Sequence, residues 1–396
     1  MKRTCYVLLL LTFLLSTIIS SSQAAWQGPI QVLSGVWGSG VGQFGFEAGD
    51  SGDDFPRSFG ISASQRIIIA DSINEVLHVF DNNGMFLRDI NKPQEWSGWP
   101  SSVLVNGECA VVGYVQMTHT FDIATGNLLG KANNMGGAKY VNENCSSIYS
   151  GGKKKGWKIY TPTGQLLKTS SEMPLELGKV TTEPLGSARY KITISYPDKI
   201  YGLSADRAFV RFTRDIKGFI YGVNAGGAWR FNQCGNMIGA VLLPSAQITT
   251  IPSQGKGEPN VNVHEEYGEP VIAQNGDVYT WKRTPDKYFI LKWTWVDDPN
   301  VPTGPDAPTG LTLMPSTTGI YLTWTASPGD PGCVTGYEIS RATSAGGVAT
   351  TVATVNAGVV KYNDSTGSAG TTYYYKIRAK AGSEYSNYTA EVSGKR

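Results

Sequence analysis

The chain has 396 residues, of which 41% are hydrophobic and only 17% are charged, with a formal net charge of +2. This length suffices for two or three cores of about 150 residues each, while the low charge excludes a coiled coil and the apolar content excludes a disordered chain. Aromatic residues are frequent, and the 47 Gly residues are well above the usual share. That pairing is typical of short strands joined by tight turns, so we expect an all-β protein.

The first residues have the pattern of a secretory signal peptide, which we predict over residues 1–24. Lys2-Arg3 gives a basic start, an apolar run follows from Val7 to Ile19, and small residues precede a cleavage site before Ala25. No later segment reaches the roughly 20 apolar residues that cross a bilayer. We therefore expect a secreted chain, extracellular, on the cell surface or in the periplasm, that does not span a membrane. Cleavage would bring the net charge to about zero, which excludes a globally basic surface.

A repeat of short strands runs from about residue 26 to residue 297. Each unit reads as a short strand, a turn, an apolar strand, a loop, a strand with an aromatic end, a turn with Gly, and a further strand. The third strands end at Phe80, Phe121, Tyr160 and Phe231, and the turns after them contain Gly84, Gly126, Gly164 and Gly235. Such turns predict antiparallel pairing between the third and fourth strands.

The spacing of these units is typical of β-propeller blades. The first-strand positions are separated by 43, 37, 72 and 59 residues, counted along Ile61, Leu104, Val141, Thr213 and Ile272. Periods of about 40 to 45 residues belong to four-stranded blades, which bury their faces only when neighbours stack around an axis. The step of 72 predicts a diverged blade at about 171–206, which gives six. Ile30–Leu33 has no unit of its own, so we expect it to be the outer strand of the last blade, closing the ring.

The first unit resembles a unit of the NHL-repeat β-propeller family. The resemblance is carried by Gly40-Val41-Gly42-Gln43-Phe44, Phe55-Pro56, Gly60-Ile61, Ala70-Asp71-Ser72, Asn74, Val79-Phe80-Asp81, Gly84 and Phe86-Leu87. An insertion, Gly45–Asp54, separates the two halves of the pattern, and the later units keep only the strand rhythm. The resemblance implies a propeller at residues 25–297 and leaves its ligand open. Some NHL propellers bind RNA, but an exported chain of near-zero net charge lacks the basic surface that nucleic acid requires.

A linker and a second β unit follow. Residues 298–308 carry four prolines and are predicted to be an extended linker. Residues 309–396 contain alternating strands, such as Ile320-x-Leu322-x-Trp324 and Tyr373-x-Tyr375-x-Ile377. With Gly336-Tyr337-Glu338-Ile339, this stretch resembles a fibronectin type III domain, an immunoglobulin-like β-sandwich. The predicted fold is therefore all-β, a six-bladed β-propeller followed by this sandwich.

Four cysteines remain after the predicted cleavage: Cys109, Cys145, Cys234 and Cys333. Export permits disulfides, and four cysteines allow three full pairings. Cys109 and Cys145 occupy matching places in neighbouring repeats and are a candidate pair. The expected distance between equivalent strands of neighbouring blades instead favours free buried thiols. The pairing stays open at this point.

The sequence carries no catalytic or metal-binding signature. It has 3 His, no CxxC and no HExxH, and no cofactor or metal site is predicted. His78 and His119 each share a sheet face with the aromatic residue two positions later, so packing between blades accounts for them. Glu143 and Asp215, at strand ends, are expected to be solvated turn residues.

Cations and aromatic residues gather in loops predicted to lie on one face of the propeller. These loops, between second and third strands or between successive blades, contain Trp96, Trp99, Lys153, Lys154, Lys155, Lys282, Arg283 and Lys287. Tryptophan offers stacking area, and Lys and Arg attract negative charge, so this face is a candidate recognition surface for an anionic or sugar-rich partner. The alternative is that the lysines are solvated turn residues and that both tryptophans are buried between blades.

We therefore expect a secreted or cell-surface binding protein that recognises an extracellular protein or a polysaccharide, and not nucleic acid. The alternative is a secreted lyase or hydrolase with an axial divalent metal. A structural subunit of a larger surface assembly is a third possibility. The sequence leaves the ligand, any catalysis and the oligomeric state open.

Overall fold

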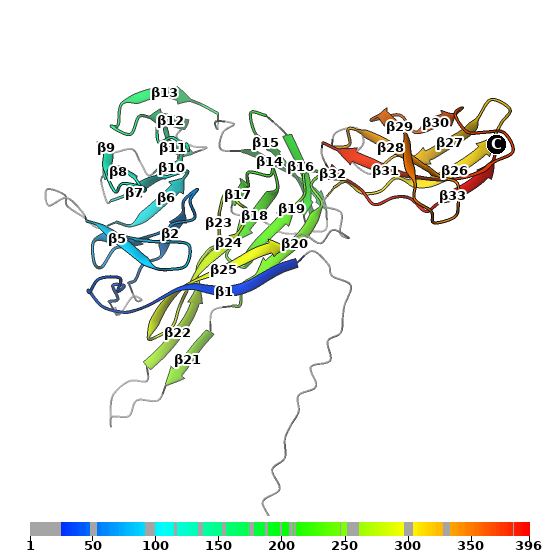
Figure 1. The fold of residues 1–396 in the computed structure, drawn as a ribbon. Coiled ribbons are helices and arrows are strands. Elements are labelled where there is room, and N and C mark those ends of the chain that lie inside the picture. Colours follow the sequence, from blue (N-terminus) through cyan, green and yellow to red (C-terminus); the bar gives the residue numbers. More distant parts are fainter. Residues whose placement is uncertain are drawn as a thin grey trace, which may run out of the picture.

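The computed structural model describes residues 25–47, 54–91, 100–114, 117–133, 138–152, 156–172, 174, 178–186, 189–198, 200–205, 209, 211–245, 247–251, 261–296, 304–327, 333–382 and 384–396. The predicted signal peptide lies outside these ranges, as does the first part of the predicted linker. Throughout the described residues the secondary structure is all β, in small antiparallel sheets (Figure 1). No helix of this part of the chain has the length and apolar character needed to cross a membrane.

Three four-stranded sheets come first, each with its strands paired in chain order. Sheet 1 contains β2 (Ser58–Ile61), β3 (Ile67–Asp71), β4 (Val76–Phe80) and β5 (Phe86–Asn91). Sheet 2 contains β6 (Ser102–Asn106), β7 (Cys109–Gly113), β8 (Met117–Asp122) and β9 (Leu128–Asn133). Sheet 3 contains β10 (Ala138–Val141), β11 (Ile148–Gly152), β12 (Gly156–Tyr160) and β13 (Leu166–Ser170).

Three further sheets complete the repeat region. Sheet 4 contains β14 (Lys179–Gly186), β15 (Arg189–Ser195) and β16 (Ile200–Ala205), within the range where the sequence predicts a diverged unit. Sheet 5 contains β17 (Arg211–Arg214), β18 (Ile220–Asn224), β19 (Gly227–Phe231) and β20 (Met237–Leu242). Sheet 6 contains β21 (Gln247–Ile251), β22 (Val261–Tyr267), β23 (Val271–Ile272), β24 (Val278–Arg283), β25 (Lys287–Val296) and the N-terminal strand β1 (Ala25–Val36).

The N-terminal strand completes sheet 6. β1 runs antiparallel to β25, with Leu33 opposite Ile290 and Val36 opposite Lys287 (Figure 1). Leu33 is buried in the same cluster as Ile290 and Tyr288. The outer strand of the last sheet is thus supplied by the segment that the sequence places there, because its buried Leu33 completes the apolar face of β25.

Five apolar clusters join neighbouring sheets in series. One joins sheet 6 to sheet 1, the next joins sheets 1 and 2, and a third joins sheets 2 and 3. Two more join sheet 4 to sheet 5 and sheet 5 to sheet 6. Among the residues that the structure describes, no such cluster joins sheet 3 to sheet 4. The order of packing is therefore 3-2-1-6-5-4, so sheet 6, with β1 as its outer strand, connects the two halves.

The turns between third and fourth strands are built on glycine, as the sequence predicts. Gly84, Gly126, Gly164 and Gly235 have φ values of 80°, 80°, 86° and 84°. This left-handed region suits glycine because other residues place Cβ against their own backbone there. At Gly84 an added Cβ would also collide with the backbone carbonyl of Val32 in β1. The turn therefore fixes how closely sheet 1 approaches β1.

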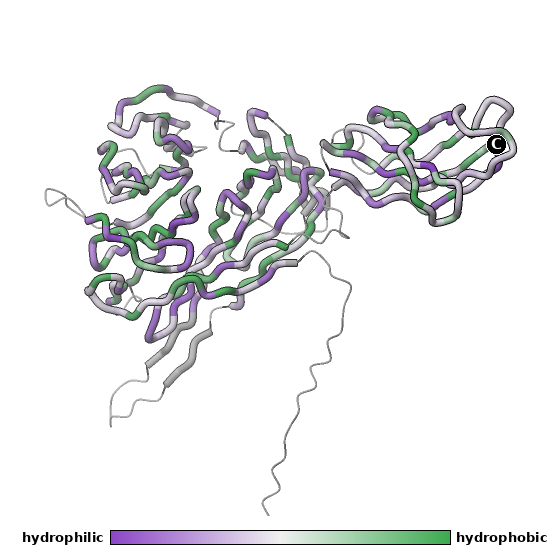
Figure 2. Tube along the Cα trace, viewed as in Figure 1, coloured by the Kyte–Doolittle hydropathy of each residue, from purple (hydrophilic) through white to green (hydrophobic). Residues whose placement is uncertain are grey.

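Residues 309–396 form a separate two-sheet sandwich (Figure 1). One sheet contains β26 (Thr309–Pro315), β27 (Ile320–Thr325) and β30 (Lys361–Asp364). The other contains β28 (Gly336–Ala342), β29 (Thr350–Asn356), β31 (Thr372–Ala381), β32 (Glu384–Tyr385) and β33 (Val392–Lys395). Inward residues of both sheets, including Trp324, Tyr337 and Tyr375, form one core. Buried and partly buried residues alternate along β31. Hydrophilic and hydrophobic stretches interchange along the strands of the sandwich (Figure 2).

Two disulfides join the cysteines that the sequence leaves unassigned. Cys109 is bonded to Cys145, with 5.4 Å between their Cα atoms, and links sheet 2 to sheet 3. Cys234 is bonded to Cys333, with 5.1 Å between their Cα atoms, and ties a turn of sheet 5 to the sandwich. Beside this second bond, Asn232 Nδ2 donates to the carbonyl oxygen of Gly304 at 2.7 Å. Disulfides of this kind persist in oxidising compartments.

The glycine turns give a direct test of the sheet 1 contact with β1. Gly84→Ala should lower the free energy of unfolding by about 1–2 kcal/mol through the left-handed backbone and by about 1–3 kcal/mol more through the collision with Val32. Gly126→Ala is the matched control, because its φ is also 80° and the nearest atom is the flexible Arg88 Nε at 3.3 Å. Urea unfolding measures both losses. Equal losses in the two variants would contradict the close approach at Gly84.

Candidate functional site: a cavity between the sheets

A cavity of about 1220 Å³ lies where the sheets come together. Its lining includes residues of β2, β6, β10, β14, β17 and β23, which are edge strands of sheets 1 to 6 respectively. Pockets for small ligands are typically about 300–1000 Å³, so this one has room for a larger ligand. Because six edge strands converge here, residues far apart in sequence share one surface.

One side of the cavity carries a connected group of polar side chains. Asn106 Nδ2 donates to Tyr140 OH at 3.1 Å and to the carbonyl oxygen of Val141 at 2.9 Å. Gln274 Nε2 donates to Asn106 Oδ1 at 3.0 Å and to Glu143 Oε1 at 3.3 Å. The hydrogen bonds hold Asn106, Glu143 and Gln274, from three different sheets, as one unit that we call the amide group.

Glycine brings two of the contributing turns together. Gly107, next to Asn106, has a φ of 61°, and an added Cβ would collide with the backbone of Glu143. A larger residue would push the two turns apart and separate the side chains of the amide group. The close approach of sheets 2 and 3 is therefore also a condition for the site.

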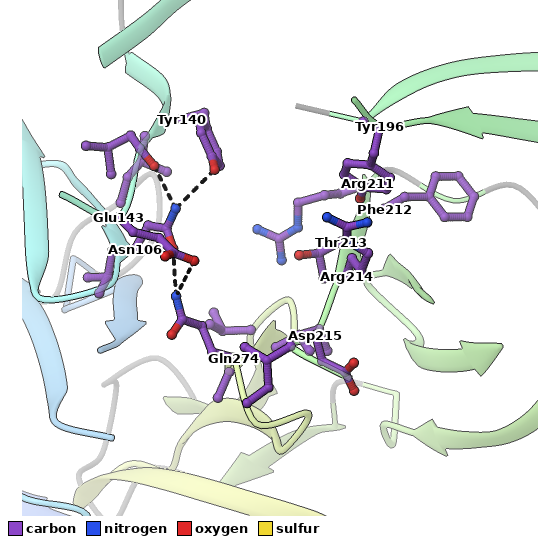
Figure 3. Close-up of a pocket in the computed structure, with 18 of the residues that line it drawn as sticks. Asn106, Tyr140, Glu143, Tyr196, Arg211, Phe212, Thr213, Arg214, Asp215 and Gln274 are labelled. Atoms are coloured by element: carbon purple, nitrogen blue, oxygen red, sulfur yellow. Dashed lines mark hydrogen bonds between the residues drawn. The ribbon is translucent and has the colours of Figure 1, made fainter. Parts of the chain in front are cut away.

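Cations come from β17 on the opposite side. Figure 3 shows Arg211, Thr213 and Arg214 facing Asn106, Tyr140 and Glu143 across the cavity. Arg211 Nη2 donates to the carbonyl oxygen of Pro270 at 2.7 Å and lies 3.5 Å from Glu269 Oε1. Its side chain remains 46% exposed. Desolvation lowers the pKa of Arg211, and Glu269 partly offsets this, but a guanidinium stays charged at neutral pH.

Arg214 forms an ion pair with both carboxylate oxygens of Asp198. Its Nη1 contacts both carboxylate oxygens of Asp198, at 2.8 and 2.7 Å, and its guanidinium lies 4.4 Å from the centre of the Tyr196 ring. Burial alone would lower the pKa of Arg214, but the bond to Asp198 outweighs it and raises the pKa. Burial raises the pKa of Tyr196 to about 12. Arg214 therefore fixes the wall of the cavity and brings little uncompensated charge.

Asp215 differs from its sequence-based expectation, because it is buried and not a solvated turn residue. It accepts hydrogen bonds from the backbone of Lys217 at 3.0 Å and of Phe219 at 2.9 Å, and from Tyr221 OH at 2.9 Å. Burial raises the pKa of Asp215, although these donors act in the opposite direction. The Asp215 carboxylate binds donors of its own turn. The sequence could not reveal its burial, because that burial comes from the packing of the sheets.

Five of the residues predicted for the recognition face lie outside the described residues: Trp96, Trp99, Lys153, Lys154 and Lys155. Arg283 is described and is buried, with Nη2 3.2 Å from Glu266 Oε1 and the guanidinium 4.5 Å from the Phe55 ring centre. It belongs to the packing of sheet 6 and not to a solvent-facing rim. Arg283 is buried because it is the last residue of β24, beside the apolar cluster between sheets 6 and 1.

Two predicted cations lie near Arg283, with Lys282 partly buried and Lys287 exposed. Lys282 has its Nζ 5.5 Å from the Tyr267 ring centre, and Lys287 is exposed at the start of β25. Glu266, in β22, is paired with Arg283 at this end of β24. Glu269, which contacts Arg211, follows three residues later. Neither Lys282 nor Lys287 is among the residues that line the cavity.

The principal residues of the cavity escaped sequence reasoning. Arg211, Asn106 and Gln274 are isolated polar residues without a motif. The available signal was their position in the repeat. Asn106 ends the first strand of its unit, and Gln274 comes just after the first strand of another unit. These residues form one site only in the folded chain, where the edge strands converge.

Both histidines considered as candidates are buried in the sheets. His78 Nδ1 lies 2.6 Å from Asp89 Oδ1 and its Nε2 lies 3.1 Å from Asp71 Oδ2. Burial alone would lower the pKa of His78, but the two carboxylates outweigh it and raise the pKa. Desolvation lowers the pKa of His119 to about 4. Within the described ranges, no group of three or more His, Cys, Asp or Glu residues is placed to hold a metal ion.

Comparison with known proteins gives no family. No family model matches the chain, and no curated protein matches it. A fibronectin type III-like protein from Clostridium thermocellum is 34% identical over 23% of this chain and 91% of that chain, with a TM-score of 0.20. The extracellular domain assigned to a one-component system of B. thetaiotaomicron is 10% identical, covers 86% of this chain and 55% of that chain, and has a TM-score of 0.32. TM-scores this low do not establish a shared fold.

The buried histidines predict a pH dependence of stability. The unfolded chain protonates His119 near its ordinary pKa of 6.5, whereas the folded chain does so only at about 4. The free energy of unfolding should therefore fall as pH falls from 6.5 toward 4, by at most about 1.4 kcal/mol per pH unit from this residue. His78 acts in the opposite sense, because its raised pKa gives stability that is full below 6.5 and is lost as pH rises through the folded value.

Urea unfolding of His119→Phe between pH 7.5 and 4 measures the first effect. Phenylalanine fits the aromatic surroundings, where the Tyr114 ring centre is 4.8 Å from that of His119. We expect a flatter acid slope than in the wild type. An unchanged slope would show that His119 is not desolvated in the folded chain.

Proposed function

We propose that the chain is a secreted or cell-surface binding protein built on a six-bladed, NHL-like β-propeller. In this proposal residues 25–297 form the propeller, 298–308 the linker and 309–396 a fibronectin type III unit that serves as spacer or docking unit. Its partner is an extracellular protein or an anionic glycan. The observation that carries the proposal is that edge strands of sheets 1 to 6 line one cavity. Convergence of inner strands on an axis is how propeller blades are arranged.

Two further observations support this proposal. Two disulfides suit an extracellular location, where such bonds persist. Cations are found in the cavity, at Arg211, and outside it on sheet 6, at Lys282 and Lys287. Such an arrangement attracts negatively charged partners and raises their rate of association. In the proposed ring sheets 3 and 4 would be neighbours, and residues 171–178, only partly described, connect them in the sequence.

The proposal predicts loss of binding when the lysines of the predicted recognition face are removed. The variant with Lys153, Lys154, Lys155, Lys282 and Lys287 changed to Ser should bind an extracellular fraction or acidic polymer on the order of tenfold more weakly at low salt. Arg283 is left intact because its removal would disturb packing. Pull-down followed by surface plasmon resonance measures the change.

A matched control removes exposed lysines of the sandwich, with Lys361 and Lys395 changed to Ser. This variant should bind like the wild type. Equal binding by the loop variant and the wild type would contradict a role for the loop face. A stoichiometric metal in the purified protein, together with a chelator-sensitive melting temperature, would instead support the lyase or hydrolase alternative.

A further inference from the structure

The charged residues that line the cavity do not balance one another. Its cations are Lys139, Arg211, Arg214 and Lys217, and its anions are Glu143, Asp198 and Asp215. Arg214 is neutralised by Asp198, and Asp215 is enclosed in its own turn. Arg211 also lies 3.5 Å from Glu269, which is not part of the lining, so Lys139, Arg211 and Lys217 face two carboxylates, Glu143 and Glu269, and a small excess of positive charge remains. A concave site focuses this charge on whatever enters.

Arg211 has the geometry to receive a carboxylate. Its contacts with Pro270 and Glu269 both use Nη2. Among the residues that the structure describes, Nε and Nη1 contact no other hydrogen-bond partner, and the side chain is 46% exposed. Nε and Nη1 lie on different edges of the guanidinium, and each can donate one charge-assisted hydrogen bond to a carboxylate oxygen. The bond to Pro270 holds the group in place before any ligand arrives.

The amide group on the opposite side supplies acceptors for neutral polar groups. Gln274 Nε2 is used for Asn106 and Glu143, and among the described residues no donor is bound to the Gln274 carbonyl oxygen or to the second Glu143 oxygen; both residues line the cavity. Hydroxyl groups can donate to both of these acceptors. The ring of Tyr140, only partly buried, stands beside them and offers an apolar face.

Shape distinguishes a glycan from a folded protein. A folded partner presents a surface too broad to enter a recess of about 1220 Å³, and it would contact only the rim. A chain of sugar rings is narrow, carries many hydroxyl groups, and has apolar ring faces that pack on aromatic side chains. An acidic sugar adds the carboxylate that Arg211 is placed to receive.

We propose that the cavity binds a segment of an acidic glycan, with Arg211 receiving a sugar carboxylate and the amide group receiving hydroxyls of the same segment. This inference rests on the proposed function and names its ligand class. The site is the cavity itself, which the sequence-based recognition face of exposed loops does not include.

Isothermal titration of the mature chain with short oligomers of galacturonate, guluronate and glucuronate tests the inference. Each oligomer is compared with its methyl ester, which keeps the chain and removes the charge. At least one acidic oligomer should bind roughly ten- to hundredfold more tightly than its ester. Arg211→Gln should abolish this difference, and Arg211→Lys should retain part of it, because lysine keeps the charge and loses the planar fork.

Two controls keep the test decisive. The melting temperature of each variant shows that it folds, and Lys282→Ser with Lys287→Ser should preserve the difference between acid and ester. Equal affinity for acid and ester, an unchanged difference in Arg211→Gln, or no binding of any oligomer would overturn the inference. If the loop variant loses a captured extracellular partner while Arg211→Gln keeps it, the proposed function stands and only the cavity inference fails.

Discussion

Antiparallel pairing of β1 with β25 is the interaction on which the rest of the repeat region depends. The apolar clusters join the sheets in the order 3-2-1-6-5-4, so sheet 6 is the link between two groups of sheets. β1 supplies the outer strand of that link and places Leu33 in the cluster shared by sheets 6 and 1. The Gly84 turn of sheet 1 then lies against the backbone of Val32. The N-terminal strand thus covers the edge of β25 and positions the neighbouring sheet.

The cavity is a consequence of this arrangement and not of any local motif. Each edge strand contributes a few residues: Asn106, Glu143 and Gln274 lie at or after the end of a strand, whereas Arg211 begins β17. Glycine at 107 allows two of these turns to approach, and the Arg214–Asp198 pair fixes the wall formed by β17 and sheet 4. Arg211 then faces the amide group across the opening (Figure 3). Tyr140 and Tyr196 stand beside these polar groups and add apolar surface.

Local sequence signals predicted the secondary structure well and the cavity poorly. The aromatic-ended third strands and their Gly turns were readable because hairpin geometry depends on neighbouring residues only. The place of β1 was readable because the repeat lacked one strand. The burial of Asp215 and Arg283 was not, since each is enclosed by residues from elsewhere in the chain. The pairing of Cys234 with Cys333 depends on how sheet 5 meets the sandwich, which no local pattern encodes.

Hydrogen–deuterium exchange of the mature chain tests most directly whether β1 completes sheet 6. Those amides of Gln31–Val36 that donate to β25 should exchange as slowly as the amides of β24 and β25, because they are protected by the same sheet and open with it. Rapid exchange of β1, typical of a loose terminal segment, while β24 and β25 remain protected, would contradict the account.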